Sequence, residues 1–188
     1  MTGQGKTAID IVLAESIKEL SKDYPIEKIT IKEITDKAGV IRPTFYNHFQ
    51  DKYKLIEWII TNELLLPMHP LIEANMITEA MVLLFTNIEK DKAFYTRAVK
   101  LEGPITFHSI AMKCVKQELL GIIDSRISGK VQKHIWLSPE VIATYFAQSM
   151  CYVAEEWITQ GMIVPPKEMA QAYNYIVSHS FDDVINEM

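Results

Sequence analysis

A short run of polar side chains between positions 42 and 52 has the chemistry that nucleic-acid recognition requires. The residues are Arg42, Thr44, Tyr46, His48 and Lys52. A guanidinium group can donate two hydrogen bonds to a guanine edge, and hydroxyl, imidazole and ammonium groups can bond phosphate oxygens. We interpret this segment as a surface for DNA, provided that the local structure presents these side chains together.

Two short predicted helices would position this run. Thr30 and Glu33 have the spacing of a capping box, which marks a helix start. Gly39 can adopt a left-handed conformation and so end the first helix. Pro43 favours the start of the second helix, with Arg42 as its predicted cap. Two short helices joined by a glycine-containing turn make a helix-turn-helix, whose second helix enters the major groove of DNA.

The segment from residue 30 to residue 52 resembles the DNA-binding domain of the TetR/AcrR transcription regulators. That family's motif reads roughly T-x-x-x-I-A-x-x-A-G-V-S-x-x-T-x-Y-x-H-F-x-x-K. The string RPTFYNHFQDKYKLIEWI is also similar to the subgroup that contains the dihydroxyacetone-kinase-operon activators. Positions that match the motif are Thr30, Ile34, Ala38, Gly39, Val40, Thr44, Tyr46, His48, Phe49 and Lys52.

The resemblance implies roles for individual side chains. Contacts to the DNA backbone are implied for Thr30, Tyr46, His48 and Lys52. Base contacts or mixed contacts are implied for Arg42, Pro43 and Thr44. Two positions depart from the family pattern, because Ile41 stands where serine is common and Pro43 stands where a small residue is common. These departures leave the base contacts open, and the alternative is an ordinary helical hairpin in which Tyr46 and His48 are structural.

The charge is divided unevenly along the chain, whose formal net charge is −5. Residues 1–52 hold eight Lys or Arg and eight Asp or Glu, and the remainder holds eleven and sixteen. The first part is therefore neutral and must present its cations locally to bind phosphate. No apolar run is long enough to span a membrane, and the amino terminus lacks the layout of a signal peptide. We expect a cytoplasmic protein with no membrane contact.

Residue patterns typical of enzymes and metal sites are missing from the sequence. Cys114 and Cys151 have no CxxC spacing, and the five histidines form no HxH or HxxxH pattern. No glycine-rich phosphate loop, nucleophile elbow or paired-acid motif is present. We therefore predict no catalytic site, no metal and no cofactor, with both cysteines as buried free thiols.

The periodicity of apolar residues is helical almost throughout, which predicts an all-α protein of about nine helices. We expect a three-helix helix-turn-helix domain over 1–52 and a helical domain for ligand binding and dimerisation over 53–188. A helix after residue 50 should reach residue 66. Other helices are expected over about 6–22, 75–89, 92–101, 106–127, 139–160 and 166–186.

The last two predicted helices carry more apolar surface than one monomer core requires, so part of it should be buried against a second subunit. The resemblance adds that family members dimerise through such a pair and bind near-palindromic double-stranded operator DNA. Residues predicted for this interface are Phe146, Met150, Val153, Trp157, Tyr173, Ile176 and Val177.

The resemblance further implies a small-molecule effector bound among the helices of the second domain. Candidate wall residues are Met81, Phe85, Phe107, Met112 and Tyr145, with plain core packing as the alternative. A second hypothesis, prompted by the resemblance to operon activators, makes the acidic domain a docking surface for a partner protein instead of an enclosed pocket. The operator sequence, the effector and the sign of regulation are left open by the sequence.

Overall fold

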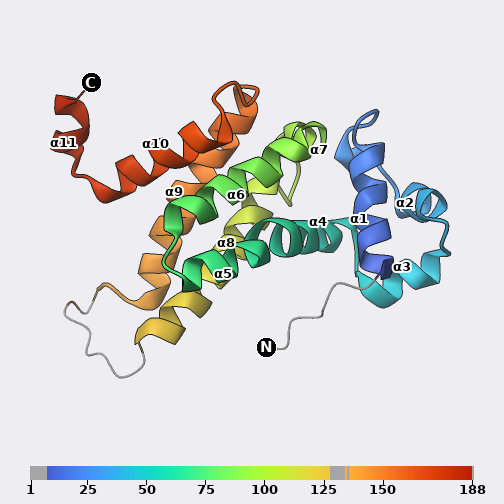
Figure 1. Cartoon of the computed structure of the whole chain (residues 1–188). Helices are drawn as coiled ribbons and strands as arrows, with labels where there is room; N and C mark the ends of the chain where they lie inside the picture. The colour runs from blue at the N-terminus through green and yellow to red at the C-terminus, as the bar shows by residue number, and fades with distance from the viewer. Residues whose placement is uncertain (1–7, 128–133, 135, 188) are drawn as a thin grey trace.

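The computed structural model describes residues 8–127, 134 and 136–187, which are helical with no strand among them (Figure 1). The predicted all-α class is confirmed. We call the helices before residue 50 the head and the rest the body. The head consists of α1 (Ala8–Leu20), the 3-10 helix η1 (Ile26–Lys28), α2 (Ile31–Ala38) and α3 (Arg42–His48).

The body begins with α4, which runs from the head toward the opposite end of the molecule (Figure 1). Its first elements are α4 (Lys52–Ile59), the π-helix η2 (Ile60–Leu65), the 3-10 helix η3 (Leu66–Met68) and α5 (His69–Glu73). Its later elements are α6 (Ile77–Lys90), α7 (Lys92–Ala98), α8 (Phe107–Ile127), α9 (Pro139–Thr159), α10 (Pro166–Ser178) and α11 (Phe181–Asn186).

Local signals determine the turn between α2 and α3. The Thr30 hydroxyl accepts from the Glu33 amide at 3.2 Å, and the Glu33 carboxylate accepts from the Thr30 amide at 2.8 Å, which is the predicted capping box. Gly39 has φ +69°, a left-handed conformation that costs glycine no steric strain. The prediction for Arg42 is wrong in one respect. Ile41 holds the extended cap position of α3, and Arg42 is the first helical residue.

The helix that enters the body does not stay regular. We predicted one helix from residue 50 to residue 66, but α-helical geometry ends at Ile59 and a π-helix follows. In this π-helix the Leu66 amide donates to the Thr61 carbonyl, five residues back. The Asn87 side chain donates to the Glu63 carbonyl at 3.0 Å, so a group from α6 supports the irregular backbone. Such segments often occur at functional positions.

The end of the chain also differs from its prediction. A single helix was expected over 166–186, but α10 ends at Ser178 and His179 is extended, with φ −117° and ψ 155°. Ser180 then caps α11 through a capping box with Asp183. This break, the π-helix, the short α5 and the 3-10 helices η1 and η3 explain why the described residues form more elements than the predicted nine.

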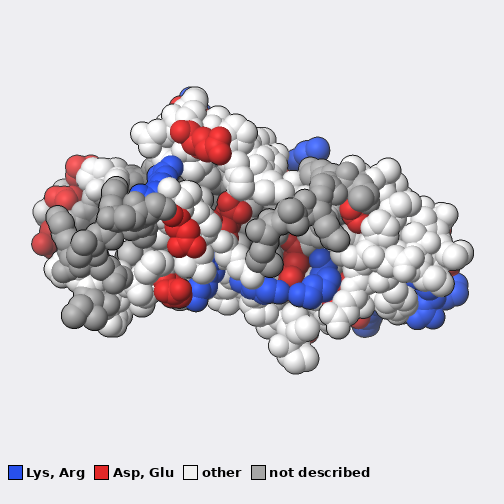
Figure 2. Space-filling view, turned by 90° about the horizontal axis from the view of Figure 1, so that it is seen from below, with Lys and Arg blue, Asp and Glu red and all other residues white. Residues whose placement is uncertain are grey.

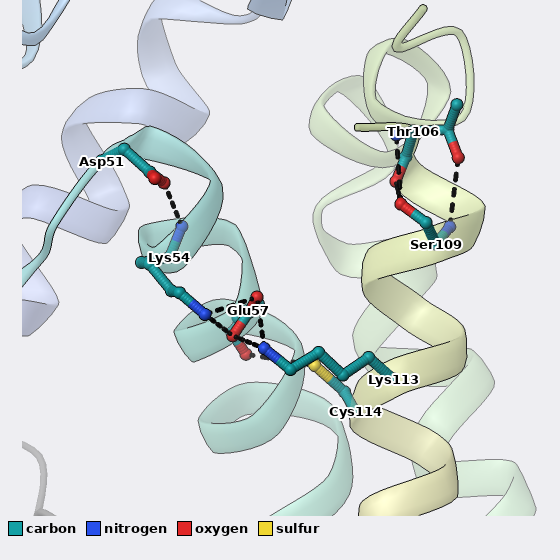
Figure 3. A network of polar contacts seen from close by, with 7 residues as sticks. All are labelled: Asp51, Lys54, Glu57, Thr106, Ser109, Lys113 and Cys114. Carbon is teal, nitrogen blue, oxygen red and sulfur yellow. Dashed lines mark hydrogen bonds and ion pairs between the residues drawn. The ribbon is translucent and has the colours of Figure 1, made fainter. Parts of the chain in front are cut away.

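The body is built around the pair α8 and α9, with α6 and α10 packed against each other beside it (Figure 1). Polar contacts fasten α4 to α8, because Lys54 from α4 and Lys113 from α8 both reach Glu57 (Figure 3). The nitrogen–oxygen distances are 3.0 and 2.9 Å. Thr106 and Ser109 cap the start of α8 in the same view. None of the described helices combines the length and the apolarity that a membrane crossing requires.

Candidate nucleic-acid interface

Helix α3 is oriented by two phenylalanines on its inner face. Phe45 is fully buried and Phe49 is 7% exposed, and their ring centroids lie 5.9 Å apart. Residues four positions apart lie on the same side of a helix, so these two rings leave the opposite side to solvent. Pro43 and Tyr46 are exposed and Thr44 is half-buried, while Arg42 is exposed because it stands at the very start of α3. The start of α3 is thus presented outward.

Arg42 differs from two other exposed cations of the head, Lys22 and Lys32. Lys22 is paired with Glu19 at 2.5 Å, and Lys32 is paired with Asp36 at 2.6 Å. Within the described residues Arg42 makes no ion pair, so its guanidinium group is available to an anion or a base edge. Figure 2 shows basic side chains at the far end of the head (right) and both acidic and basic groups over the body.

Lys52 is engaged by the protein itself. Its Nζ donates to the backbone carbonyls of Ile26, Glu27 and Ile29 at 2.8, 2.7 and 2.9 Å. An ammonium group has three protons, so these contacts use all of its donors. Burial lowers the pKa of Lys52 from its usual value. The side chain therefore holds the η1 turn against the start of α4.

His48 and Thr30 also have partners within the head. His48 Nδ1 lies 2.8 Å from the Asp10 carboxylate of α1, and Asp10 is 5% exposed. This contact fixes the orientation of the imidazole ring and leaves Nε2 for another group. The Thr30 hydroxyl donates to Glu33 at 2.7 Å within the capping box. Asp10 was not among the predicted site residues, although an acid three and four positions before Leu13 and Ala14 lies on the buried face of α1.

The residues predicted for a subunit interface fall into two groups. Phe146, Ile176 and Val177 are 39, 53 and 38% exposed, and Met150 and Val153 are half-buried. Trp157 and Tyr173 lie in the chain's own core, at 3 and 5% exposed. The Trp157 ring stands edge-on to Phe85, and its Nε1 donates to the Val164 carbonyl at 2.8 Å. The apolar face that is left exposed also includes Tyr145 and Tyr152, at 70 and 63%.

A cavity of about 40 Å³ lies in the body between η2, α6, α7, α8 and α9. Of the residues predicted for an effector pocket, Phe107 lines it. Met81 and Phe85 are buried elsewhere in the core, and Met112 is half-buried. Tyr145 lies outside the cavity, on the outer surface of α9. The wall also includes Tyr95 and three residues of the π-helix, Ile60, Leu64 and Leu65.

No group of three or more His, Cys, Asp or Glu side chains that could hold a metal ion occurs in the described part of the chain. Cys114 and Cys151 are both free and buried. Burial raises the pKa of Cys114 to about 11 and that of Cys151 to about 12, which disfavours the reactive thiolate.

Similarity to known proteins covers both parts of the chain. Residues 14–59 match the family model described as "Bacterial regulatory proteins, tetR family". Residues 75–179 match the family model described as "Transcriptional regulator C-terminal region". The HTH-type dhaKLM operon transcriptional activator DhaS of Lactococcus lactis is 22% identical over 171 residues, which are 89% of this chain and 86% of the relative.

Other relatives agree with these matches. The HTH-type transcriptional regulator YxbF of Bacillus subtilis is 44% identical over 46 residues, 24% of this chain and 12% of that protein. The structure of the dihydroxyacetone kinase operon activator DhaS has a TM-score of 0.60 at 20% identity, covering 90% of this chain and 93% of its own. The fatty acid degradation regulator FadR of Bacillus halodurans has a TM-score of 0.59 at 11% identity, covering 95 and 98%. These likenesses show the fold, and the family models show that the chain belongs to the TetR family of bacterial transcriptional regulators.

Proposed function

We propose that this chain is a homodimeric regulator that binds a near-palindromic operator in double-stranded DNA and responds to a small-molecule effector. The observation that carries the proposal is the exposed guanidinium group of Arg42 at the amino-terminal end of α3, which has no ion pair in the described part of the chain. The amino-terminal residues of a recognition helix contact base edges in the major groove. Family membership supports the same use of α3.

The position and exposure of each side chain decide whether we assign it to bases or to phosphates. Arg42, Pro43 and Thr44 are assigned to bases, since they lie in the first turn of α3. Tyr46, which is 50% exposed, and His48 through Nε2 are assigned to phosphates. Thr30 and Lys52 are assigned an indirect role in binding the DNA backbone. They fix the amino-terminal ends of α2 and α4, whose backbone amides would face the phosphates.

Dimerisation is supported by the exposed apolar side chains of α9 and α10, which a monomer in water would leave uncovered. A two-fold dimer would set two α3 helices about 34 Å apart, on successive major grooves. One head has no net charge and so gains little from long-range attraction to DNA. Two linked heads overcome this weakness, because the second binds at a high effective concentration.

The operator is obtained first, by selecting genomic DNA fragments that the purified protein retains. Arg42→Ala should then lower affinity at least tenfold and relax sequence preference. Tyr46→Ala should weaken binding to all sequences and leave the salt dependence unchanged, because a tyrosine carries no charge that releases counterions. Lys22→Ala is the matched control, because it also removes an exposed cation of the head, at a position that follows the carboxyl-terminal end of α1 and lies outside α3. Unchanged affinity of the Arg42 variant at moderate salt would contradict the assignment.

The dimer is tested separately by sedimentation. Ile176→Asp places a charge in the exposed face of α10 and should dissociate the protein into monomers. Ile163→Asp is the control, because Ile163 is 83% exposed in the turn after α9. Dissociation by both variants, or by neither, would argue against this interface.

A second candidate function is an activator whose body docks a partner protein. The observation that favours it is the size of the cavity, since pockets for drug-sized ligands measure roughly 300–1,000 Å³. Trp136 and Tyr145 are exposed beside a shallow surface hollow on α9, at 74 and 70%. Trp136→Ser should abolish regulation in cells, with operator binding and dimerisation intact, only if this surface binds a partner.

A further inference from the structure

Ile41 stands immediately before helix α3 with most of its side chain in solvent. It is 69% exposed, more than any other large apolar side chain in the described part of the head. Its backbone is extended, with φ −89° and ψ 153°, and its carbonyl accepts from the Thr44 amide at 2.9 Å. A single exposed apolar residue is common on protein surfaces, so exposure alone assigns no role. The place of Ile41, directly before Arg42, is what makes it informative.

An isoleucine at this position is unfavourable for the helix that it starts. The neighbouring helices α2 and α4 are capped by the side chains of Thr30 and Asp51, whereas α3 has no side-chain cap. Isoleucine ranks far below serine, threonine, asparagine and aspartate at a cap, because it cannot accept a hydrogen bond from a free backbone amide. Ile41 therefore neither caps α3 nor fills the core. The fold of the head gives no reason for a large apolar side chain here.

The start of α3 also offers little to a phosphate group. Pro43 has no amide hydrogen, and the Thr44 amide already donates to the Ile41 carbonyl. A helix binds anions at its amino-terminal end through free amides, so this end of α3 is poorly equipped for that task. Ile41 and Pro43 are both exposed. The two residues that flank Arg42 in the sequence are thus suited to an apolar partner.

The bases of DNA present one apolar group in the major groove, the C5-methyl group of thymine. The first residues of a recognition helix are those that reach base edges. Adjacent Cα atoms lie about 3.8 Å apart and successive bases about 3.4 Å apart, so consecutive residues reach neighbouring base pairs. The Ile41 side chain is therefore in place to meet a base pair close to the one that Arg42 contacts.

We propose that Ile41 determines part of the operator sequence by packing against the methyl group of a thymine in each half-site. This inference rests on the proposed binding of operator DNA and adds a specificity-determining residue to it. The thymine should lie within about two base pairs of the position that Arg42→Ala affects. Burial of one methyl group is expected to change affinity about fourfold.

Deoxyuridine tests this contact, because it differs from thymidine only by the absence of the methyl group. Each thymine of the selected operator is replaced in turn, in both half-sites together, and affinity is measured by DNA titration at fixed salt. At one position the wild-type protein should lose about fourfold per half-site, or more than about tenfold in all. Ile41→Ala should bind the unmodified operator at least as weakly, with no further loss when that methyl group is removed.

Two further variants separate base recognition from folding. Ile11→Ala makes the same change at an isoleucine of α1 that is 41% exposed, and it should keep the full loss at that thymine. Ile41→Ser supplies the missing cap and should raise the midpoint of thermal unfolding by about 2–4 °C. Its binding should be as insensitive to the methyl group as that of Ile41→Ala. Greater stability combined with loss of thymine recognition is a result that a structural role for Ile41 would not give.

An equal effect of deoxyuridine on the wild type and on Ile41→Ala at every thymine would overturn the proposal, and so would an unchanged operator affinity of Ile41→Ala. A marked loss of stability in Ile41→Ser would contradict it as well, because the side chain would then support the fold. These results would leave operator binding itself intact, which the selection and the Arg42→Ala experiment measure separately. If the purified protein selects no operator, the proposed function fails and this inference fails with it.

Discussion

The ammonium group of Lys18 lies 3.0 Å from the carboxylate of Glu63, which joins the first helix of the head to the π-helix of the body. Lys18 also reaches Glu15 at 2.6 Å and Asp91 at 2.9 Å. Burial alone would lower the pKa of Lys18. Hydrogen bonds to the three carboxylates outweigh that effect and raise it, so the cation persists until the pH exceeds its already high usual value. The junction between head and body is thus charged at every physiological pH.

Lys18→Met should destabilise the protein by about 2–4 kcal/mol, because it keeps most of the side-chain volume but leaves Glu63 and Asp91 without their cation. Both carboxylates keep some contact with water, at 20 and 24% exposed, which holds the cost below that of a fully buried pair. The free energy of unfolding in urea measures the effect. Lys22→Met, which breaks an exposed pair, is the control and should have no measurable effect.

Lys52→Met should lower the free energy of unfolding by about 1–3 kcal/mol, since three backbone carbonyls lose a charged donor. Arg42→Ala should leave stability unchanged and weaken operator binding. Denaturation and a DNA titration on both variants separate the two roles. Full stability of the Lys52 variant combined with loss of operator affinity would instead favour a direct phosphate contact.

Gly39→Ala should cost about 1–2 kcal/mol, because φ +69° strains any residue with a Cβ. The strain is purely conformational, since an added Cβ would meet no atom within 4 Å. Gly121→Ala is the matched control, because the same atom is added inside α8 in equally open space. It should stabilise the protein by about 0.5–1 kcal/mol. Thermal unfolding of both variants checks the sign, and two changes of equal sign would contradict this explanation.

Cys114 and Cys151 should react slowly with a maleimide at pH 8, because burial raises the pKa of these thiols to about 11 and about 12. Unfolded cysteine has a pKa near 8.5. Since the folded values are higher, the stability they contribute is complete below about pH 8.5 and is lost as the pH rises toward 11. Labelling rates with and without urea measure the protection, and the single Cys→Ser variants assign it. Fast labelling of the native protein would show that the thiols are accessible.

Much of the structure of the head can be predicted from the sequence, because the residues that determine it act locally. The Thr30 capping box, the glycine at position 39 and the paired Phe45 and Phe49 each act over a few residues, so their spacing alone predicts α2, the turn and the inner face of α3. The breaks in the last helix and after Ile59 were missed. After Ile59 the contact of a distant side chain, Asn87 on the Glu63 carbonyl, stabilises a geometry that propensity does not favour. The break in the last helix does have a local signal, the capping box of Ser180 and Asp183, which the helical periodicity obscured.

The sequence by itself determined the all-α class, the helix-turn-helix and the residue types that can meet DNA. Tertiary structure decided which of those side chains remain free. Lys52 is used by carbonyls 23 to 26 positions away, and His48 is oriented by a carboxylate 38 positions away, whereas Arg42 is left without an ion pair in the described residues. The hydroxyl of Tyr95 is likewise left without a hydrogen-bond partner among the described residues. Hydrogen bonds of this kind depend on elements brought together only in the folded chain, and no local spacing in the sequence records them.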